Sequence, residues 1–455
     1  EVTQTGLSTD LNLVSETADV GFKEYRFTCN LDMALKAESP AITSGIDVSG
    51  SYVHLNGAML SNEEKQSSTP WHTGVDITQG KIRLLLPEDV PSDAGFLELY
   101  QHIKGKEFVT FLDSGDENII INGSISDLSW LSVLIENRLG LSITGSGEVA
   151  ATVVLSQGWL GTGSVLEILP QTLGVDVLDY RAEGNGKASL LLEKGGKQPD
   201  VKLHVELERG VMRRKDEPQA FIENVQMILQ ALVKSITIGE KEMDIALHLQ
   251  IPEANIKDIS AYNQYLPPNS PIAFTGGKAD LTADIQMTPE TADGYVRLRT
   301  SDISARVDHQ AVEGELQADI TLIDGIPENM EFDISGSSVT LDNVRVAGAE
   351  TSHDDEKWAA HFQLRKAQAV WKRPISVFLE ADLDMTDSKP IVAVIANQRG
   401  THGWLEKALT IDDLVGEAQV DIDQDRIIIP YAFATSDKID VGAKGVISAD
   451  ERNGV

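Results

Sequence analysis

The most suggestive catalytic motif in the sequence is the triplet Asp113-Ser114-Gly115, which follows an apolar segment at residues 108–112. Aspartic proteases carry a catalytic carboxylate in such a triplet, and a second carboxylate must share its proton. A chain of this size would need a second Asp-Ser-Gly or Asp-Thr-Gly triplet, and the sequence contains none. Asp, Ser and Gly are also typical turn residues. We therefore interpret the triplet as a polar hairpin turn between two apolar segments.

Three aspartates at alternate positions, Asp421, Asp423 and Asp425, have the spacing of the first ligands of a calcium-binding loop. The match then ends, because Arg426 stands where that loop requires glycine and Ala432 where it requires a bidentate glutamate. An alternating pattern places the three carboxylates on the solvent face of a strand instead.

The remaining chemical motifs are incomplete. The nine histidines form neither a His-Glu-x-x-His motif nor a pair at helical ligand spacing, and we expect residues 353–356 to be a solvated loop. Gly184-Asn185-Gly186-Lys187 lacks the first glycine and the final Ser or Thr of a phosphate-binding loop. No Gly-x-Ser-x-Gly motif occurs, and Cys29, the single cysteine, has no activating neighbour. The sequence predicts no metal site, no cofactor and no enzymatic activity.

Charge limits the possible partners. The chain has 38 Lys and Arg against 71 Asp and Glu, a net charge of −33 at pH 7. Nucleic acids are bound through clustered basic residues, and the longest basic run is Arg213-Arg214-Lys215, so we exclude nucleic acid as a partner. No uncharged apolar stretch approaches the roughly 18 residues of a membrane-spanning helix. We expect any anchor or export signal to precede Glu1.

The elements that must carry the function are strands. Six segments share one pattern, a glycine followed by strict alternation of apolar and polar residues, and they begin at Gly80, Gly147, Gly186, Gly277, Gly314 and Gly416. A period of two is typical of β-strands with one buried face. The second, fourth and sixth residues after each glycine define the predicted inner face: Ile82, Leu84, Leu86, Val149, Ala151, Val153, Ala188, Leu190, Leu192, Ala279, Leu281, Ala283, Leu316, Ala318, Ile320, Ala418, Val420 and Ile422.

Helices are expected at residues 126–139 and 216–234, with a weaker one at residues 402–409. In the second, Asp216 is the predicted N-cap, Pro218 lies in the first turn, and the apolar stripe is Phe221, Val225, Ile228, Leu229 and Leu232. We expect these helices to cover an end of the sheet, or alternatively to gate a groove. The predicted fold is all-β and mainly antiparallel: an elongated, curved amphipathic sheet that forms a groove, with two or three short amphipathic helices.

Domain boundaries are weakly marked, because the repeat is irregular. The prolines near Pro267 indicate one connection. We divide the chain into an N-terminal β region at residues 1–124, a middle β region with two helices at 125–266 and a C-terminal β region at 267–455. One continuous body is the alternative.

The glycine-led strands, the passage at residues 265–285 and the passage at residues 314–348 with Leu341-Asp342-Asn343-Val344 resemble the AsmA and TamB-like proteins of Gram-negative envelopes. The resemblance is clearest from residue 265 to residue 346. It implies an inner-membrane anchor followed by a periplasmic β body, curved into a trough that carries phospholipid tails. It also implies phospholipid and envelope proteins as partners and no catalytic residues. Its functional surface is the inner face, here the apolar residues named above.

Two functions follow from these patterns. The first is a lipid-binding scaffold or conduit, because small inward residues such as Ala151, Ala283 and Ala418 leave room beside the sheet. The alternative is a structural or adhesive β-sandwich or β-solenoid that binds proteins or glycans through its acidic surface. Alanine-rich inward positions suit both folds, so the residues alone leave the choice open.

Overall fold

The structure is a computed structural model that describes residues 7–22, 25–41, 44–61, 70–86, 98, 101, 112–129, 139–236, 245–268, 270, 272–307, 310–346, 358–388, 412–423, 426–436, 440–448 and 452–454. Strands make up 75% of it. An ordinary globular domain has roughly 20–25% strand. The predicted all-β, mainly antiparallel fold class is therefore confirmed.

The chain forms two compact units. Unit 1 is Glu1–Gly210, Arg214–Asp216 and Ile228–Leu247, and unit 2 is Val211–Arg213, Glu217–Met227 and His248–Val455. The boundaries predicted at residues 124 and 266 remain predictions, as does the alternative of one continuous body.

Unit 1 contains β1 (Leu7–Phe22), β2 (Tyr25–Ser39), β3 (Ile46–Asp47), β4 (Tyr52–Ser61), β5 (Trp71–Gln79), β6 (Lys81–Leu84), β7 (Leu112–Asp113), β8 (Ile119–Ile125), β9 (Ser142–Val153), β10 (Leu155–Ser156), β11 (Trp159–Leu160), β12 (Val165–Val177) and β13 (Tyr180–Lys194). Three strands have residues in both units: β14 (Asp200–Arg214), β15 (Ile222–Val233) and β16 (Ile245–Ile256). Unit 2 contains two short 3₁₀ helices, η3 (Ile259–Tyr265) and η4 (Pro327–Asn329). Its strands are β17 (Ile272–Gly276), β18 (Ala279–Met287), β19 (Ala292–Val307), β20 (Gln310–Leu322), β21 (Asp324–Ile326), β22 (Glu331–Asp333), β23 (Ser338–Val346), β24 (Trp358–Val370), β25 (Ser376–Asp387), β26 (Asp412–Asp423), β27 (Arg426–Thr435), β28 (Asp440–Ser448) and β29 (Arg452–Gly454).

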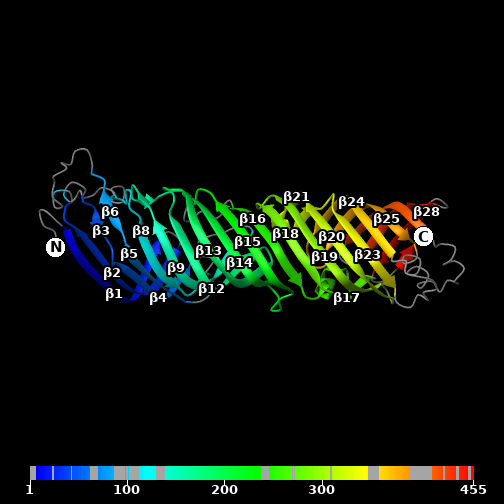
Figure 1. Ribbon diagram of the computed structural model, residues 1–455, viewed down its shortest axis with the longest axis horizontal. Helices are drawn as coiled ribbons and strands as arrows, with labels where there is room; N and C mark the ends of the chain where they lie inside the picture. Colours follow the sequence, from blue (N-terminus) through cyan, green and yellow to red (C-terminus); the bar gives the residue numbers. More distant parts are fainter. Residues whose placement is uncertain are drawn as a thin grey trace. The chain divides into compact units, whose positions relative to one another are not determined.

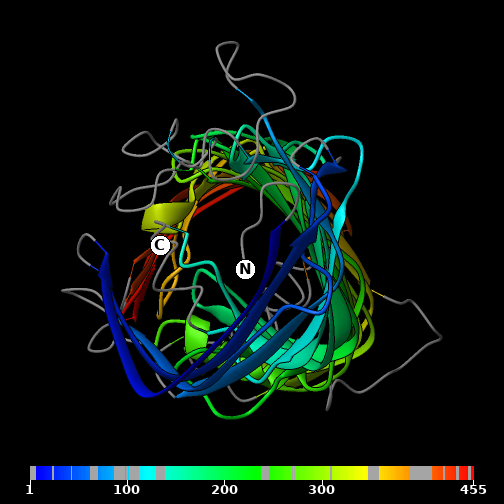
Figure 2. The ribbon, with the colours of Figure 1, turned by 90° about the vertical axis from the view of Figure 1, so that its left-hand side faces the viewer.

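The long strands of unit 1 pair antiparallel in the series β1, β2, β4, β5, β8, β9, β12, β13. They lie side by side from blue to green in Figure 1. The register of β1 against β2 shifts between Ser15 and Ala18. A bulge of this kind increases twist and bends the strands. Figure 2 shows β1 and β2, in blue, curving along their length.

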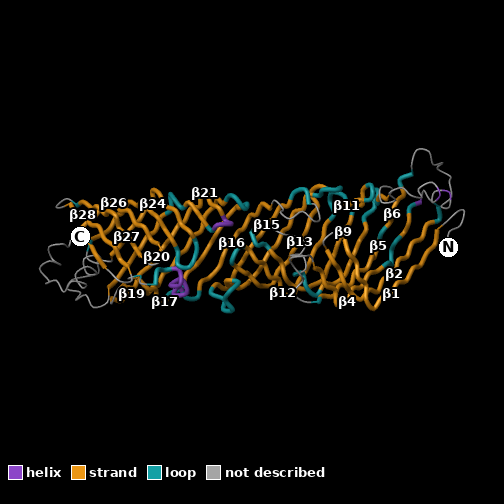
Figure 3. Tube along the Cα trace, turned by 180° about the vertical axis from the view of Figure 1, so that it is seen from behind, coloured by secondary structure: helices purple, strands orange, loops and turns teal. Residues whose placement is uncertain are grey.

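Unit 2 repeats this arrangement with the series β18, β19, β20, β23, β24, β25, β26, β27, β28. Figure 3 shows η3, in purple, beside β17. Asp258 caps η3 by accepting a hydrogen bond from the Ser260 amide at 2.9 Å. The ring of Tyr265, at the end of η3, stacks on Trp371 with centroids 4.8 Å apart. These contacts anchor the short helix to the sheet of unit 2.

The helix predicted at residues 216–234 is wrong, because this segment contains strand β15. The buried side chains alternate as Val225, Met227, Leu229, Ala231 and Val233. The apolar stripe predicted for the helix included buried residues of the strand, such as Leu229, and partly exposed residues of its other face, such as Ile228. β-branched residues also favour the extended conformation.

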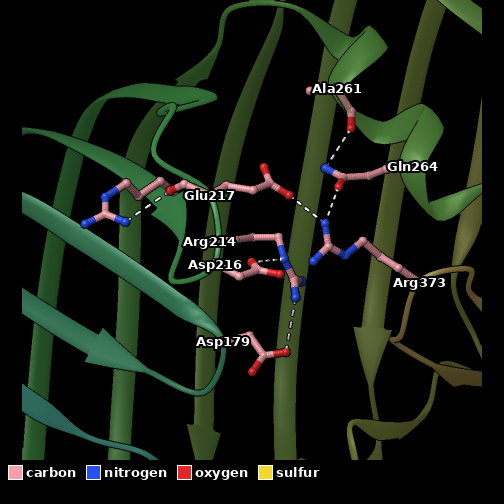
Figure 4. Close-up of polar contacts among 8 residues, drawn as sticks. Asp179, Arg214, Asp216, Glu217, Ala261, Gln264 and Arg373 are labelled. Carbon is pink, nitrogen blue, oxygen red and sulfur yellow. Dashed lines mark hydrogen bonds and ion pairs between the residues drawn. The ribbon is translucent and has the colours of Figure 1, made fainter.

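The residues that were expected to start this helix make other contacts. In unit 1, the Asp216 carboxylate accepts from Arg214 Nε at 3.1 Å, and Arg214 Nη2 lies 3.4 Å from Asp179 (Figure 4). In unit 2, the Glu217 carboxylate accepts from Arg373 Nη1 at 2.6 Å. The helices predicted at residues 126–139 and 402–409 lie largely or wholly outside the described residues.

Candidate functional site: the apolar face of each unit

In unit 1, one row of directly paired residues crosses eight strands. Following the register from β1 to β13, it consists of Leu13, Met33, Val53, Val75, Gly123, Val149, Ile168 and Ala188. Every member is apolar or glycine. Directly opposed residues on one sheet face have Cβ atoms about 5 Å apart. The row is therefore a continuous apolar strip.

A second row of unit 1 runs beside the first, through Ile77, Ile121, Ala151, Leu166 and Leu190. The structure thus brings together four predicted inner-face residues of two different repeats: Val149, Ala151, Ala188 and Leu190. Val153 is paired with Ile119 at the end of this surface, and Leu192 lies further along β13. Ile82 and Leu84 lie apart from these rows on β6, where they pair with Ile46 and Leu112, and Leu86 follows the end of that strand.

Unit 2 has an equivalent row across eight strands. From β18 to β27 it consists of Leu281, Leu298, Ala318, Val339, Phe362, Leu383, Gly416 and Ala434. Flanking rows are Ala283, Val296 and Ile320 on one side and Leu316, Leu341, Ala360, Met385 and Leu414 on the other. Ala279 begins β18, and Ala418, Val420 and Ile422 follow one another along β26. All the predicted inner-face residues of unit 2 lie on these strands.

Burial shows how completely this face is covered. Of the predicted inner-face residues, only Ala188, Ala279, Ala283 and Ala418 are buried, and the other fourteen are partly exposed. The larger residues of the unit 2 row, such as Phe362 and Leu383, are partly exposed as well. Taller neighbours shield an alanine methyl group, whereas the tip of a leucine or phenylalanine is buried only by atoms above the sheet. The residues that the structure describes therefore leave part of the apolar face uncovered.

The sequence patterns missed some members of the unit 2 row. Val377, Leu379, Ala381, Leu383 and Met385 alternate along β25 and would have been found by the same period-two rule. β24 is harder to find, because a register shift between Leu364 and Lys366 interrupts its alternation.

The opposite face of the strands is mainly polar and carries cross-strand charge pairs, with exposed apolar side chains at Leu169, Val415 and Phe433. In unit 2, Arg365 on β24 contacts Asp382 at 3.4 Å and Glu417 at 2.9 Å. In unit 1, hydrogen bonds from His204 and Lys187 hold the pKa of the Glu206 carboxyl below its usual value. One face of each sheet therefore suits water and the other suits hydrocarbon.

Two hollows of the structure are lined mainly by side chains of the polar face. A hollow of about 870 Å³ in unit 1 is lined by residues that include His54, His72, Asp76, Ser124, Glu148 and Leu169. A smaller hollow of about 350 Å³ lies on β19 and β20 of unit 2. The groove expected on the apolar face remains a prediction.

The Asp113-Ser114-Gly115 triplet forms a turn. Asp113 Oδ1 accepts from the Gly115 amide at 2.7 Å, and the fully buried Ser114 hydroxyl exchanges hydrogen bonds with the backbone of Leu155. The predicted hairpin differs in detail, because β7 pairs with β6.

The other chemical motifs also lie in strands or outside the described residues. The Gly184-Asn185-Gly186-Lys187 stretch lies within β13, and Asp421 and Asp423 lie in β26. Asp425 and residues 353–356 fall outside the described residues. Within the described ranges, no group of three or more His, Cys, Asp and Glu side chains is arranged to hold a metal ion. Nor does that part of the chain include a helix with the length and apolarity needed to cross a membrane.

Comparison with protein-family models, with curated proteins and with solved structures finds no match for this chain.

Proposed function

We propose that the protein is a non-enzymatic lipid-binding scaffold or conduit whose apolar faces hold acyl chains. The observation that carries this proposal is the unbroken apolar row across eight strands of each unit. Several of its larger side chains, such as Leu13 and Val53 in unit 1 and Phe362 in unit 2, are exposed or partly exposed. An exposed apolar surface of this extent is a typical site for apolar ligands or partners.

An acyl chain matches this surface in shape and energy. It is long and narrow, as the rows are, and it needs no hydrogen-bonding partner. Each CH₂ group that it buries contributes about 0.8 kcal/mol. Contact of one acyl chain with several neighbouring strands would therefore offset the entropy lost on binding.

The resemblance of residues 265–346 to AsmA and TamB-like proteins supports a cellular location and a ligand for this activity. We propose a periplasmic location, phospholipid as the ligand, envelope proteins as partners, and a contribution to phospholipid transport and envelope integrity. The elongated groove with its short amphipathic helices belongs to the same proposal.

The test is the lipid content of purified protein carrying Leu281→Asp, compared with Thr282→Asp. Leu281 lies on the apolar row, whereas Thr282 pairs with Arg297 on the polar face of the same strand. A carboxylate on the apolar face repels hydrocarbon, so we expect organic extraction and mass spectrometry to show less phospholipid only in Leu281→Asp. Equal phospholipid in the two folded variants would contradict the proposal.

The acidic polar face supports a second candidate function, the binding of proteins or glycans by a structural or adhesive protein. The hollow of about 870 Å³ in unit 1 favours it, because small-molecule sites have volumes of about 300–1,000 Å³. Its carboxylates and hydroxyl groups would accept hydrogen bonds from a polyhydroxylated ligand. Replacement of Ser124 by leucine would place an apolar side chain in the hollow and remove a hydroxyl group, and we expect weaker oligosaccharide binding without loss of bound lipid. Unchanged oligosaccharide binding in this variant would exclude the hollow as the site.

A further inference from the structure

The smaller hollow of unit 2 carries two arginines in an otherwise strongly acidic chain. It has a volume of about 350 Å³ and is lined by Tyr295, Arg297, Arg299, Asp319, Ile320 and Thr321. Arg297 and Arg299 follow one another on the polar face of β19, and Asp319 and Thr321 do so on β20.

Arg297 is held in place by its neighbours. Its Nε atom lies 3.2 Å from Asp319 Oδ1, and its guanidinium lies over the ring of Tyr295, 4.3 Å from the centroid. This arginine is thus paired with the one carboxylate of the hollow.

Arg299 has no such partner. Its cross-strand neighbours are Asp280 on β18 and Gln317 on β20. Asp280 Oδ1 instead accepts from Asn255 Nδ2 at 2.8 Å, and Gln317 Nε2 donates to Asp319 Oδ2 at 2.5 Å. Across the described part of the chain, no side chain forms a hydrogen bond or ion pair with the Arg299 guanidinium.

We propose that this hollow binds a phosphate-type oxyanion through Arg299. A guanidinium presents parallel N–H donors that match two oxygens of a phosphate group, and the hydroxyls of Tyr295 and Thr321 offer further donors. Two guanidiniums and one carboxylate line the hollow, while the Asp280 carboxylate, opposite Arg299 on β18, lies outside the lining and accepts a hydrogen bond from Asn255. The acidic field of the rest of the chain is screened beyond about 8 Å at physiological ionic strength.

The site is separate from the apolar row. Leu298 lies between the two arginines in sequence and points to the opposite face of β19, so an acyl chain on the row and an anion in the hollow are on different sides of the sheet. The inference therefore goes beyond the proposed function and does not depend on it. The oxyanion has two possible sources, a soluble phosphate ester or a phospholipid headgroup at a bilayer surface.

Calorimetric titration with glycerol 3-phosphate, and flotation with vesicles containing phosphatidic acid, test the site. Arg299→Gln removes the free guanidinium. Arg306→Gln is the matched control, because Arg306 is an exposed arginine on the same strand outside the hollow. We expect at least a tenfold loss of affinity in Arg299→Gln and no change in Arg306→Gln.

Saturable binding of glycerol 3-phosphate that depends on Arg299 supports a soluble ester as the source. Arg299-dependent flotation without such binding supports a bilayer headgroup. Three results would overturn the inference: no binding of either probe, equal binding by the wild-type protein and Arg299→Gln, or the same loss in Arg306→Gln. The last result would mean that the probes respond only to net charge. Circular dichroism of each variant establishes that the comparison is between folded proteins.

Discussion

At the scale of single residues, the polar face contains a carboxylate whose ionised form is stabilised by its neighbours. Asp284 accepts a hydrogen bond from Gln250 Nε2 at 2.8 Å and lies 2.8 Å from His248 Nε2. These contacts hold the pKa of Asp284 below its usual value, with the Gln250 hydrogen bond as the largest cause. The network therefore stabilises the folded protein more when the carboxylate is ionised than when it is neutral.

The pH dependence follows from this shift. A depressed folded-state pKa stabilises the protein above the unfolded value of about 3.9, and the contribution is lost as the pH falls through the folded-state pKa. We expect Asp284→Asn to lower the free energy of unfolding at pH 7 and to have a smaller effect at pH 3. Urea unfolding of both proteins at the two pH values measures this difference. An equal effect at both pH values would contradict the assignment.

At the scale of elements, β15 replaces the helix predicted at residues 216–234, and two neighbouring residues of it distinguish the strand from the helix. A helix places Ile228 and Leu229 on the same apolar stripe, whereas the strand buries Leu229 completely and leaves Ile228 partly exposed on the other face. We expect Leu229→Asp to cost several kcal/mol of stability and Ile228→Asp much less. The urea unfolding midpoints of the two variants provide the comparison, and equal losses would favour the helix.

Close packing of strand backbones leads to another prediction for an element. A Cβ atom on Gly123, in β8, would lie 2.0 Å from the Gly74 carbonyl oxygen of the neighbouring strand. We expect Gly123→Ala to destabilise unit 1 by about 1–3 kcal/mol, because backbone must move. Gly21→Ala is the control, since nothing lies within 4 Å of its added Cβ atom. Thermal unfolding of the two variants should differ, and a similar melting temperature for both would show that the sheet yields easily.

The same elements show what the sequence could predict. Strict alternation after each glycine was sufficient to find β9, β13, β18, β20 and β26, because a period of two reports one buried face directly. It failed at β15, where apolar residues such as Ile228 and Leu232 also occupy the outer face and imitate a helical stripe. It could not predict which strands pair, because register depends on bulges such as the shift between Leu364 and Lys366.

At the scale of the whole molecule, each unit is an antiparallel series of strands with one apolar and one polar face. The rows were predictable in composition but not in continuity, because only the register aligns Val149 with Ile168 and Leu298 with Ala318. Partial exposure of these residues was not predictable either, since it depends on what lies above the sheet. The central claim is that hydrocarbon occupies this exposed part of the apolar face.

The most direct test of this claim uses two variants, each with one fluorescent reporter on a different face of β25. Cys29 is the only cysteine and is buried, so a Cys29→Ala background permits labelling at one introduced cysteine. Leu383→Cys places an environment-sensitive fluorophore on the apolar row, and Asp384→Cys places it on the exposed polar face of the same strand. On addition of phospholipid vesicles, we predict a blue shift of the emission at position 383 and none at position 384. No shift at position 383, or the same shift at both positions, would contradict the account.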